Sequence, residues 1–535
     1  MLATVVSATV HGLEGRVIRV EVDVAPGLPG FSIVGLADAA LLEARERVRG
    51  AIRNSGFVFP PRRITVNLAP ADLRKAGASL DLGIALGILL GSEQVHATGV
   101  RWGLVGELSL GGELRYVPGL LPMLVALARR GIRRVIVPAD SIREARLVAS
   151  IESQAAATLA EAVEVVRAPR TRPASRGAQP ARVELANEEP GDGAAGAATA
   201  GSAASAADAH DGQRPPVPDL CEVRGQAEAR RALEIALAGG HGLLLIGPPG
   251  SGKTLLARTI PNLLPPLDDE EALRATIVES VTARGPLQAL VRRRPFRSPH
   301  HTISYAGLVG GGPRLSPGEV TLAHNGVLFL DELPEFDRDV LEALREPLEE
   351  GRVAITRVGR ATIFPASFQL VAAMNLCPCG LTGSETESCR CPRGLAARYA
   401  GRISGPLRDR IDLWVEMSRV QPAQLLAGAP PESSPAVAAR IARARARQAD
   451  RPAINGRLAA RDLLAAAALS VGTRDTLVTL AELEELSARG TDRLLRVART
   501  IADLDESQAV QSDHLEEAAR FRSPARRMAD RIGAA

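Results

Sequence analysis

A glycine-rich run of eight residues carries the strongest chemical signal in this sequence. It reads Gly247, Pro248, Pro249, Gly250, Ser251, Gly252, Lys253 and Thr254. An apolar run at 242–246 precedes it and a helix-forming run at 255–260 follows it, and this order of strand, loop and helix is the context of a phosphate-binding P-loop. Glycines let backbone N–H groups wrap phosphates at a helix N-terminus. We therefore expect Lys253 to reach the β- and γ-phosphates of ATP and Thr254 to hold Mg²⁺.

Two further apolar runs end in polar residues. The run at 326–330 ends in Asp331 and Glu332, which is the pattern called Walker B. Asp331 is the predicted ligand on the metal side, and Glu332 is the predicted base that polarises the attacking water. The run at 368–373 leads to Asn375, whose amide is placed to orient that water, although asparagine in this position is also common in turns.

Four of the five cysteines are close together in the sequence, as Cys377, Cys379, Cys389 and Cys391. Four thiolates with this spacing suit a tetrahedral zinc ion, which four protein ligands would close off and make structural rather than catalytic. The spacing is not that of the commonest zinc knuckle, so four reduced thiols in a polar loop are the alternative. Cys221 stands alone and is predicted to be structural.

The elements that must position these residues divide the chain into four parts. Residues 1–167 alternate strand-like and helix-like runs, which predicts an α/β domain. Residues 168–217 are rich in Ala, Gly and Pro and are predicted to be a flexible linker. Residues 218–420 form a second α/β domain with the cysteine loop 377–391, and its continuous apolar runs suit a parallel sheet covered on both faces. Residues 421–535 are predicted to be a helical lid.

Composition limits the class of protein. The chain has 535 residues with 46% hydrophobic and 24% charged residues, which is ordinary for a globular protein and excludes a coiled coil, a collagen-like fibre and a disordered chain. The net charge of +4 is too small to indicate nucleic acid by itself. The start has no basic region before its apolar run, and no uncharged apolar stretch reaches about 18 residues. We expect a cytoplasmic protein without membrane contact.

One segment independently suggests DNA binding. No acidic residue occurs between Glu279 and Glu319, while arginines and two aromatic residues do. Cations neutralise phosphate and release counterions, and aromatic rings stack on bases. A second candidate is 351–365, which reads as a β-hairpin around 358–359. The alternative for both segments is that their arginines serve contacts between subunits. The predicted DNA contacts are Arg294, Arg297, His300, His301 and Arg357.

Together these motifs resemble the YifB/ComM family of magnesium-chelatase-like AAA+ ATPases. The resemblance is carried by the P-loop and by the runs at 294–304, 328–336, 373–375, 377–380, 404–412 and 487–504. It covers nearly the whole chain apart from the linker. One departure is Leu376, where the family commonly has proline.

The resemblance implies a homo-hexameric ring that binds ATP between subunits. Asn375 would be sensor 1, and Arg489 would be sensor 2 on the lid. Arg410 would be the arginine finger that reaches the γ-phosphate of the neighbouring subunit, with Arg402 and Arg408 as alternatives. A guanidinium suits these roles because it stays charged and grips phosphate with two nitrogens.

The resemblance also implies a function. Family members look like ring helicases that drive branch migration during recombination of DNA taken up by natural transformation, with recombination proteins as partners. A protein-remodelling ATPase and a magnesium-chelatase-type motor subunit are the alternatives. The expected cofactors are ATP and Mg²⁺, with zinc at the cysteines.

Residues 1–165 resemble a Lon-protease-like (S5-like) fold. Ser79 stands at the position of the nucleophilic serine, but Leu121 stands where a Ser–Lys dyad requires lysine. Lys75, next to the serine loop, aligns with a position that is not catalytic. We therefore predict that this domain has no peptidase activity.

Overall fold

The computed structural model describes residues 1–35, 39–71, 77–97, 99–168, 216–312, 315–357, 360–382, 389–392, 394–420 and 431–522. The chain forms two compact units, Met1–Gln213 with Glu279–Leu290, and Arg214–Val278 with Val291–Ala535. The predicted linker lies outside the described residues apart from its ends, and so does Lys75. Among the described residues, no helix is long and apolar enough to span a bilayer.

The first unit is built on a seven-stranded sheet with the order β3-β4-β2-β1-β5-β8-β9. Its long central strands β1 and β2 pair antiparallel from Leu2↔Asp23 to His11↔Glu14. The runs at 16–22, 63–68 and 134–138 form parts of β2, β4 and β8. The strands are β1 (Leu2–His11), β2 (Glu14–Ala25), β3 (Gly30–Val34), β4 (Arg63–Ala69), β5 (Trp102–Leu104), β8 (Arg134–Pro138) and β9 (Glu152–Ala156).

Helices of this unit contribute to its core. Helix α2 is apolar on every side and almost wholly buried, which is typical of a helix enclosed by other elements. The main helices are α1 (Ala39–Asn54), α2 (Asp81–Gly91), α3 (Leu120–Arg129), α4 (Ile142–Ala145) and α5 (Leu159–Arg167).

Residues 279–290, far along the chain, also belong to the first unit. The buried carboxylate of Glu144 accepts hydrogen bonds from Ser280 Oγ at 2.7 Å and from the Leu287 N–H at 3.0 Å. The backbone N–H of Gly119 donates to the Ser280 carbonyl at 2.8 Å. Burial raises the pKa of Glu144, and these donors act against that rise. The segment is therefore held by a buried polar network.

The second unit contains a five-stranded parallel sheet with the order β11-β14-β17-β10-β18. All residues of β10, β14 and β17 are buried, as expected for a parallel sheet covered on both faces. The predicted strands at 242–246, 326–330 and 368–373 are confirmed. The strands are β10 (Leu243–Ile246), β11 (Phe296–Arg297), β14 (Val327–Leu330), β17 (Gln369–Met374) and β18 (Leu413–Glu416).

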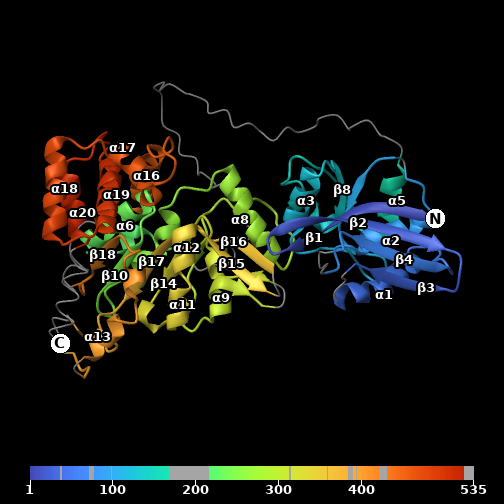
Figure 1. The fold of residues 1–535 in the computed structure, drawn as a ribbon, viewed down its shortest axis with the longest axis horizontal. Helices are drawn as coiled ribbons and strands as arrows, with labels where there is room; N and C mark the ends of the chain where they lie inside the picture. The colour runs from blue at the N-terminus through green and yellow to red at the C-terminus, as the bar shows by residue number, and fades with distance from the viewer. Residues whose placement is uncertain are drawn as a thin grey trace, which may run out of the picture. The chain divides into compact units, whose positions relative to one another are not determined.

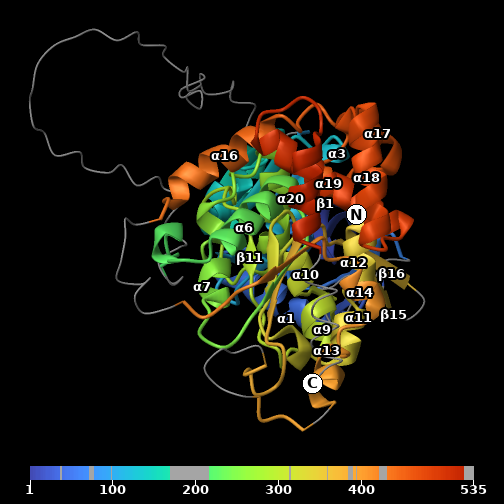
Figure 2. The ribbon, with the colours of Figure 1, turned by 90° about the vertical axis from the view of Figure 1, so that its left-hand side faces the viewer.

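The described residues after 430 are helical, as predicted, and gather at one end of the second unit (Figure 1). Turning the molecule shows α19 beside α6 (Ala227–Gly239) and α20 (Figure 2). A buried contact ties this lid to the core, because His241 Nε2 lies 2.8 Å from Thr500 Oγ1 of α19. The lid helices are α16 (Ser434–Ala446), α17 (Ala460–Ala467), α18 (Val471–Leu483), α19 (Ala488–Leu504) and α20 (Ser512–Arg520).

Two hairpins project from the second unit's core. The hairpin predicted at 351–365 is confirmed: β15 (Arg352–Arg357) pairs antiparallel with β16 (Arg360–Pro365). Its turn at 358–359 lies outside the described residues. A shorter hairpin joins β12 (Gly310–Gly311) to β13 (Ser316–Pro317).

Candidate nucleotide site

The site lies at the carboxyl edge of the parallel sheet. Gly247 follows β10, Asp331 follows β14 and Asn375 follows β17. The register pairs Ile246 with Met374 and Leu330 with Ala372, so the three strands end at nearly the same level. Loops at this edge are where open α/β sheets bind ligands. The sheet therefore brings together residues that lie up to 128 positions apart in the sequence.

Lys253 begins helix α7 (Lys253–Arg258) and turns back into the P-loop. Its Nζ donates to the carbonyls of Gly247 at 2.7 Å and Pro248 at 2.9 Å, and to Asn375 Oδ1 at 3.1 Å. Burial lowers the pKa of Lys253 to about 8, although the carboxylates of Asp331 and Glu332 act in the opposite direction. The ammonium group is thus held by dipoles at the place where a phosphate would supply full negative charge.

The pair Thr254 and Asp331 offers a cradle for Mg²⁺. Thr254 Oγ1 donates to Asp331 Oδ2 at 2.6 Å. A hydroxyl and a carboxylate oxygen are the hard ligands that Mg²⁺ takes, together with waters and substrate phosphates. The residues present therefore fit this ion, whose charge would offset that of the phosphates.

A contact of the P-loop that sequence reasoning missed comes from Gln226. Its Nε2 donates to the Ser251 carbonyl at 3.1 Å, and its backbone adopts φ 53°. Beside it, a cavity of about 840 Å³ is lined by residues such as Leu220, Gly225 and Arg230. No local sequence pattern marks this contact, because Gln226 and Ser251 are 25 positions apart and meet only in the folded chain.

His301 contacts the predicted base. Its Nδ1 lies 3.4 Å from Glu332 Oε2, and its ring packs against His300 with centroids 4.1 Å apart. His300 Nδ1 faces Thr302 Oγ1 at 3.0 Å. Of the two histidines predicted to contact DNA, His301 therefore lies beside the predicted base, and His300 is exposed next to it.

Arg294 and Arg297 are committed to carboxylates of their own unit. Both guanidinium nitrogens of Arg294 reach Glu271, at 2.8 and 3.1 Å. Arg297 forms a two-nitrogen pair with Glu319, at 2.6 and 2.7 Å. These paired charges are poor candidates for neutralising phosphate, so the DNA surface proposed below does not use them. The side chain of Arg357 lies outside the described residues.

Arg410 and Arg489 share a cavity at the opposite edge of the sheet. This cavity of about 680 Å³ is lined by both arginines and by Gly242, which precedes β10. Arg410 bonds to Glu349 and to the Pro406 carbonyl. Burial and the neighbouring arginines Arg345, Arg493 and Arg489 lower its pKa.

The two alternative finger residues lie in other surroundings. Arg402 lies 3.6 Å from Glu335, and the side chain of Arg408 is exposed.

The four predicted zinc ligands are brought together. Their sulfur atoms all lie within 4.8 Å of one another. In the first unit, by contrast, the buried Ser79 hydroxyl donates to the Ala8 carbonyl at 3.0 Å, which is a structural hydrogen bond. Leu121 is wholly buried.

Lys253 is the group that we expect to set the pH dependence of ATP binding. Its pKa of about 8 means that its charged fraction falls as the pH rises through that value. The second pKa of a phosphate is about 6, so the ligand keeps its charge there. We expect ATP affinity to fall roughly tenfold between pH 8 and pH 9.5, with proton uptake on binding. Calorimetry on Glu332→Gln, which prevents turnover, measures both. An ATP affinity that does not change between pH 8 and pH 9.5, without proton uptake on binding, would contradict this role of Lys253.

His301 is expected to restrain Glu332. Removing the imidazole in His301→Ala frees the carboxylate to polarise water, so basal ATP hydrolysis should rise several-fold. The rise should stay well below the about hundredfold or more that a general base contributes in total. His300→Ala is the matched control, since its Nδ1 faces Thr302. Steady-state phosphate release measures both variants. Equal rates in His301→Ala and wild type would show that His301 does not restrain Glu332.

Comparisons with known proteins agree with this architecture. Residues 219–425 match the family "Magnesium chelatase, subunit ChlI", residues 20–141 match "Subunit ChlI of Mg-chelatase", and residues 431–522 match the family's C-terminal part.

Relatives extend the match over nearly the whole chain. The protein YifB of Salmonella typhimurium is 41% identical over 98% of this chain and 97% of its own length. Competence protein ComM of Haemophilus influenzae is 39% identical over 98% of each chain. The Holliday junction branch migration complex subunit RuvB of Parafrankia sp. is 30% identical over 39% of this chain and 46% of its own. The chain therefore belongs to the YifB/ComM family of magnesium-chelatase-like AAA+ ATPases.

Proposed function

We propose that this protein is a hexameric motor that hydrolyses ATP between neighbouring copies and moves along DNA. Its task would be helicase or branch-migration work on DNA taken up by natural transformation, together with recombination proteins. The Haemophilus relative is named a competence protein, and the Parafrankia relative is named a subunit of a branch migration complex. The observation that carries the proposal is the contact between the two candidate DNA-binding segments, the acid-free stretch and the hairpin at 351–365.

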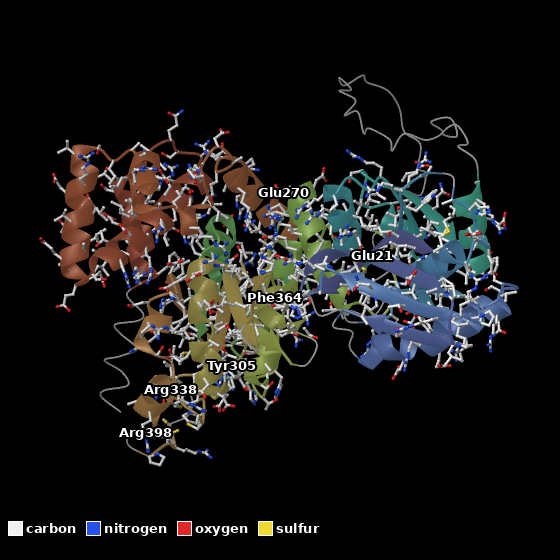
Figure 3. All side chains as sticks on the ribbon, turned by 45° about the vertical axis from the view of Figure 1, so that its right-hand side comes forward. Glu21, Glu270, Tyr305, Arg338, Phe364 and Arg398 are labelled. Atoms are coloured by element: carbon white, nitrogen blue, oxygen red, sulfur yellow. The ribbon has the colours of Figure 1, made fainter. Side chains whose placement is uncertain are left out.

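The two hairpins are in contact. A Cβ atom on Gly310 of β12 would lie 3.1 Å from Ile355 Cδ1 of β15. Tyr305 begins the short helix α9 (Tyr305–Val309) that leads into β12, and its side chain is 54% exposed (Figure 3). On β16, Phe364 is buried while its neighbour Ile363 is 55% exposed, as side chains of a strand alternate between faces. Ile363 therefore lies on the opposite face of the hairpin from Ile355, and the exposed ring of Tyr305 is the side chain that we assign to unstacked bases.

Charge for the phosphates would come from the hairpin tip. Arg357 and Arg360 pair in register at the turn end of β15 and β16. Two adjacent cations there would neutralise phosphate and give salt-dependent binding. Arg357, at the turn end of β15, is the residue among the predicted DNA contacts that we retain in this proposal.

The arrangement of Arg410 and Arg489 supports a ring. Both lie at the amino edge of the sheet, beside Gly242, while the P-loop starts at the carboxyl edge with Gly247. A strand advances about 3.3 Å per residue, so the length of β10 separates these arginines from the P-loop of their own chain. We assign both to the ATP held by a neighbouring copy, with Arg410 as the finger. Its Nε is buried without a hydrogen-bond partner among the described residues.

The same segment connects DNA to hydrolysis. His301, which contacts Glu332, lies four positions before Tyr305. DNA bound at Tyr305 would shift this segment and release the carboxylate of Glu332. Asn375, beside Lys253, would hold the attacking water in line. DNA-stimulated ATP hydrolysis follows from this connection.

Mixing two inactive variants tests the finger assignment. Arg410→Ala lacks the finger and Lys253→Ala lacks the phosphate-binding lysine, and each alone should lose about a thousandfold in rate. In a mixed ring, an Arg410→Ala copy keeps its P-loop and can receive the finger of a Lys253→Ala neighbour. A one-to-one mixture should recover about a quarter of wild-type ATPase. A site is complete only where an Arg410→Ala copy meets the finger of a Lys253→Ala copy, and each of the two positions is filled correctly in about half of the cases. No recovery in rings that are shown to be mixed, by co-purification of one untagged variant with the other, tagged variant, would overturn the assignment.

Removing the exposed aromatic tests the DNA surface. Tyr305→Ala should weaken single-stranded DNA binding by about tenfold, given the free energy of stacking a base on an aromatic ring, and lower DNA-stimulated ATPase accordingly. Leu464→Ala on the lid is the matched control, since its side chain is 60% exposed. Fluorescence anisotropy and ATPase rates with single strands and a four-way junction give the readout. Wild-type protein without DNA binding or stimulation at low salt would point to a protein-remodelling motor instead.

A further inference from the structure

The cysteine loop lies against the P-loop. Gly380 adopts φ +74°, and a Cβ atom there would lie 2.5 Å from both Cγ and Cδ of Pro249. This spacing leaves no room for any side chain between the two loops. The cysteine loop also begins two residues after Asn375, which accepts the hydrogen bond from Lys253. The loop is therefore joined to the nucleotide site through both chain connection and packing.

The four thiol groups have the spacing of ligands around one ion. Cys377 Sγ lies 3.3 Å from Cys379 Sγ and 3.8 Å from Cys389 Sγ, and Cys379 Sγ lies 3.6 Å from Cys389 Sγ. With zinc–sulfur bonds of about 2.3 Å, a tetrahedron separates its sulfurs by about 3.8 Å. A cluster of several iron atoms would hold the sulfurs farther apart. Figure 3 shows sulfur atoms close to Arg398 of α13 (Leu395–Ala400), the helix that follows.

Backbone donors support this arrangement. The Thr382 N–H donates to Cys377 Sγ at 3.3 Å, and the Cys391 N–H donates to Cys389 Sγ at 3.4 Å. The Gly380 N–H closes the turn by donating to the Cys377 carbonyl at 2.9 Å. Hydrogen bonds to ligand sulfurs orient them and stabilise negative charge. The loop is thus folded for thiolates, although most of its own residues are too polar to form a core.

We infer that Cys377, Cys379, Cys389 and Cys391 bind one Zn²⁺ and that this ion holds Gly380 against Pro249, so that metal occupancy sets nucleotide affinity. We assign zinc because four thiolates at this spacing suit its tetrahedral coordination, and the full set of four protein ligands closes the site to catalysis. Without the ion, the loop loses its crosslink and the P-loop loses a rigid neighbour. The inference rests on the ATP site alone and is independent of any action on DNA.

Metal analysis of the purified full-length protein tests the first part. We expect one zinc per chain by mass spectrometry, with release of zinc when a mercurial reagent titrates the thiols. The double variant Cys379→Ser, Cys389→Ser should lose the metal, whereas Cys221→Ser should keep it. Zinc well below stoichiometric in protein grown with added Zn²⁺, or iron in its place, would overturn the site.

A pair of glycine variants tests the link to the P-loop. Gly380 and Gly394 both adopt the left-handed region, at φ 74° and 78°, but only a side chain at Gly380 would strike Pro249, since nothing lies within 4 Å of Gly394. Gly380→Ala should retain zinc yet bind ATP about tenfold more weakly, and Gly394→Ala should match wild type.

The metal-free cysteine variant should weaken ATP binding to a similar degree. Circular dichroism and thermal melting check that each variant is folded. Unchanged ATP affinity in a folded, zinc-free variant would overturn the coupling, while loss of DNA stimulation alone would concern only the proposed function.

Discussion

The parallel pairing of β10, β14 and β17 is the constraint on which the nucleotide site depends. Each strand is short and wholly buried, so its residues have no freedom to slide without exposing apolar side chains. The register therefore fixes where Gly247, Asp331 and Asn375 emerge. The hydrogen bonds of Lys253 to Gly247 and Asn375 follow from that placement, as does the short contact of Thr254 with Asp331. A register shift of one residue in any of the three strands would therefore separate Gly247, Asp331 and Asn375.

A single run of chain connects this edge of the sheet to the other. It leaves Asn375, passes through the cysteine loop and α13, and reaches Arg410 before it enters β18. A crosslink within this run would restrict the chain between Asn375, which lies beside the P-loop, and Arg410, the finger that we propose for the neighbouring copy. From this position, the metal ion that we propose for the cysteine loop would bear on both ends of this run of chain.

The sequence predicts those features whose chemistry is local and leaves out those made by distant pairs. The P-loop, the strands that end in Asp331 and Asn375, and the hairpin at 351–365 each have a pattern within a few residues. The acid-free segment around Arg294 suggested free positive charge, but the carboxylate that pairs with it is Glu271, outside that segment. Likewise, nothing local indicates that Ser280 packs beside Glu144, because that contact depends on how the chain returns to the first unit.

Asp412 links the lid and the segment of the proposed finger Arg410 to the start of strand β10. Its carboxylate accepts the Gly242 N–H at 3.2 Å, and it lies 3.4 Å from His241 and 3.7 Å from Arg493 of the lid. Burial alone would raise the pKa of Asp412, but His241 and Arg493 lower it, so the group stays charged. It stands two residues after Arg410 and directly beside the start of β10. A movement of α19 would therefore displace Arg410, and in the proposed ring the lid would transmit a change at a neighbouring copy's ATP to strand β10 of this chain.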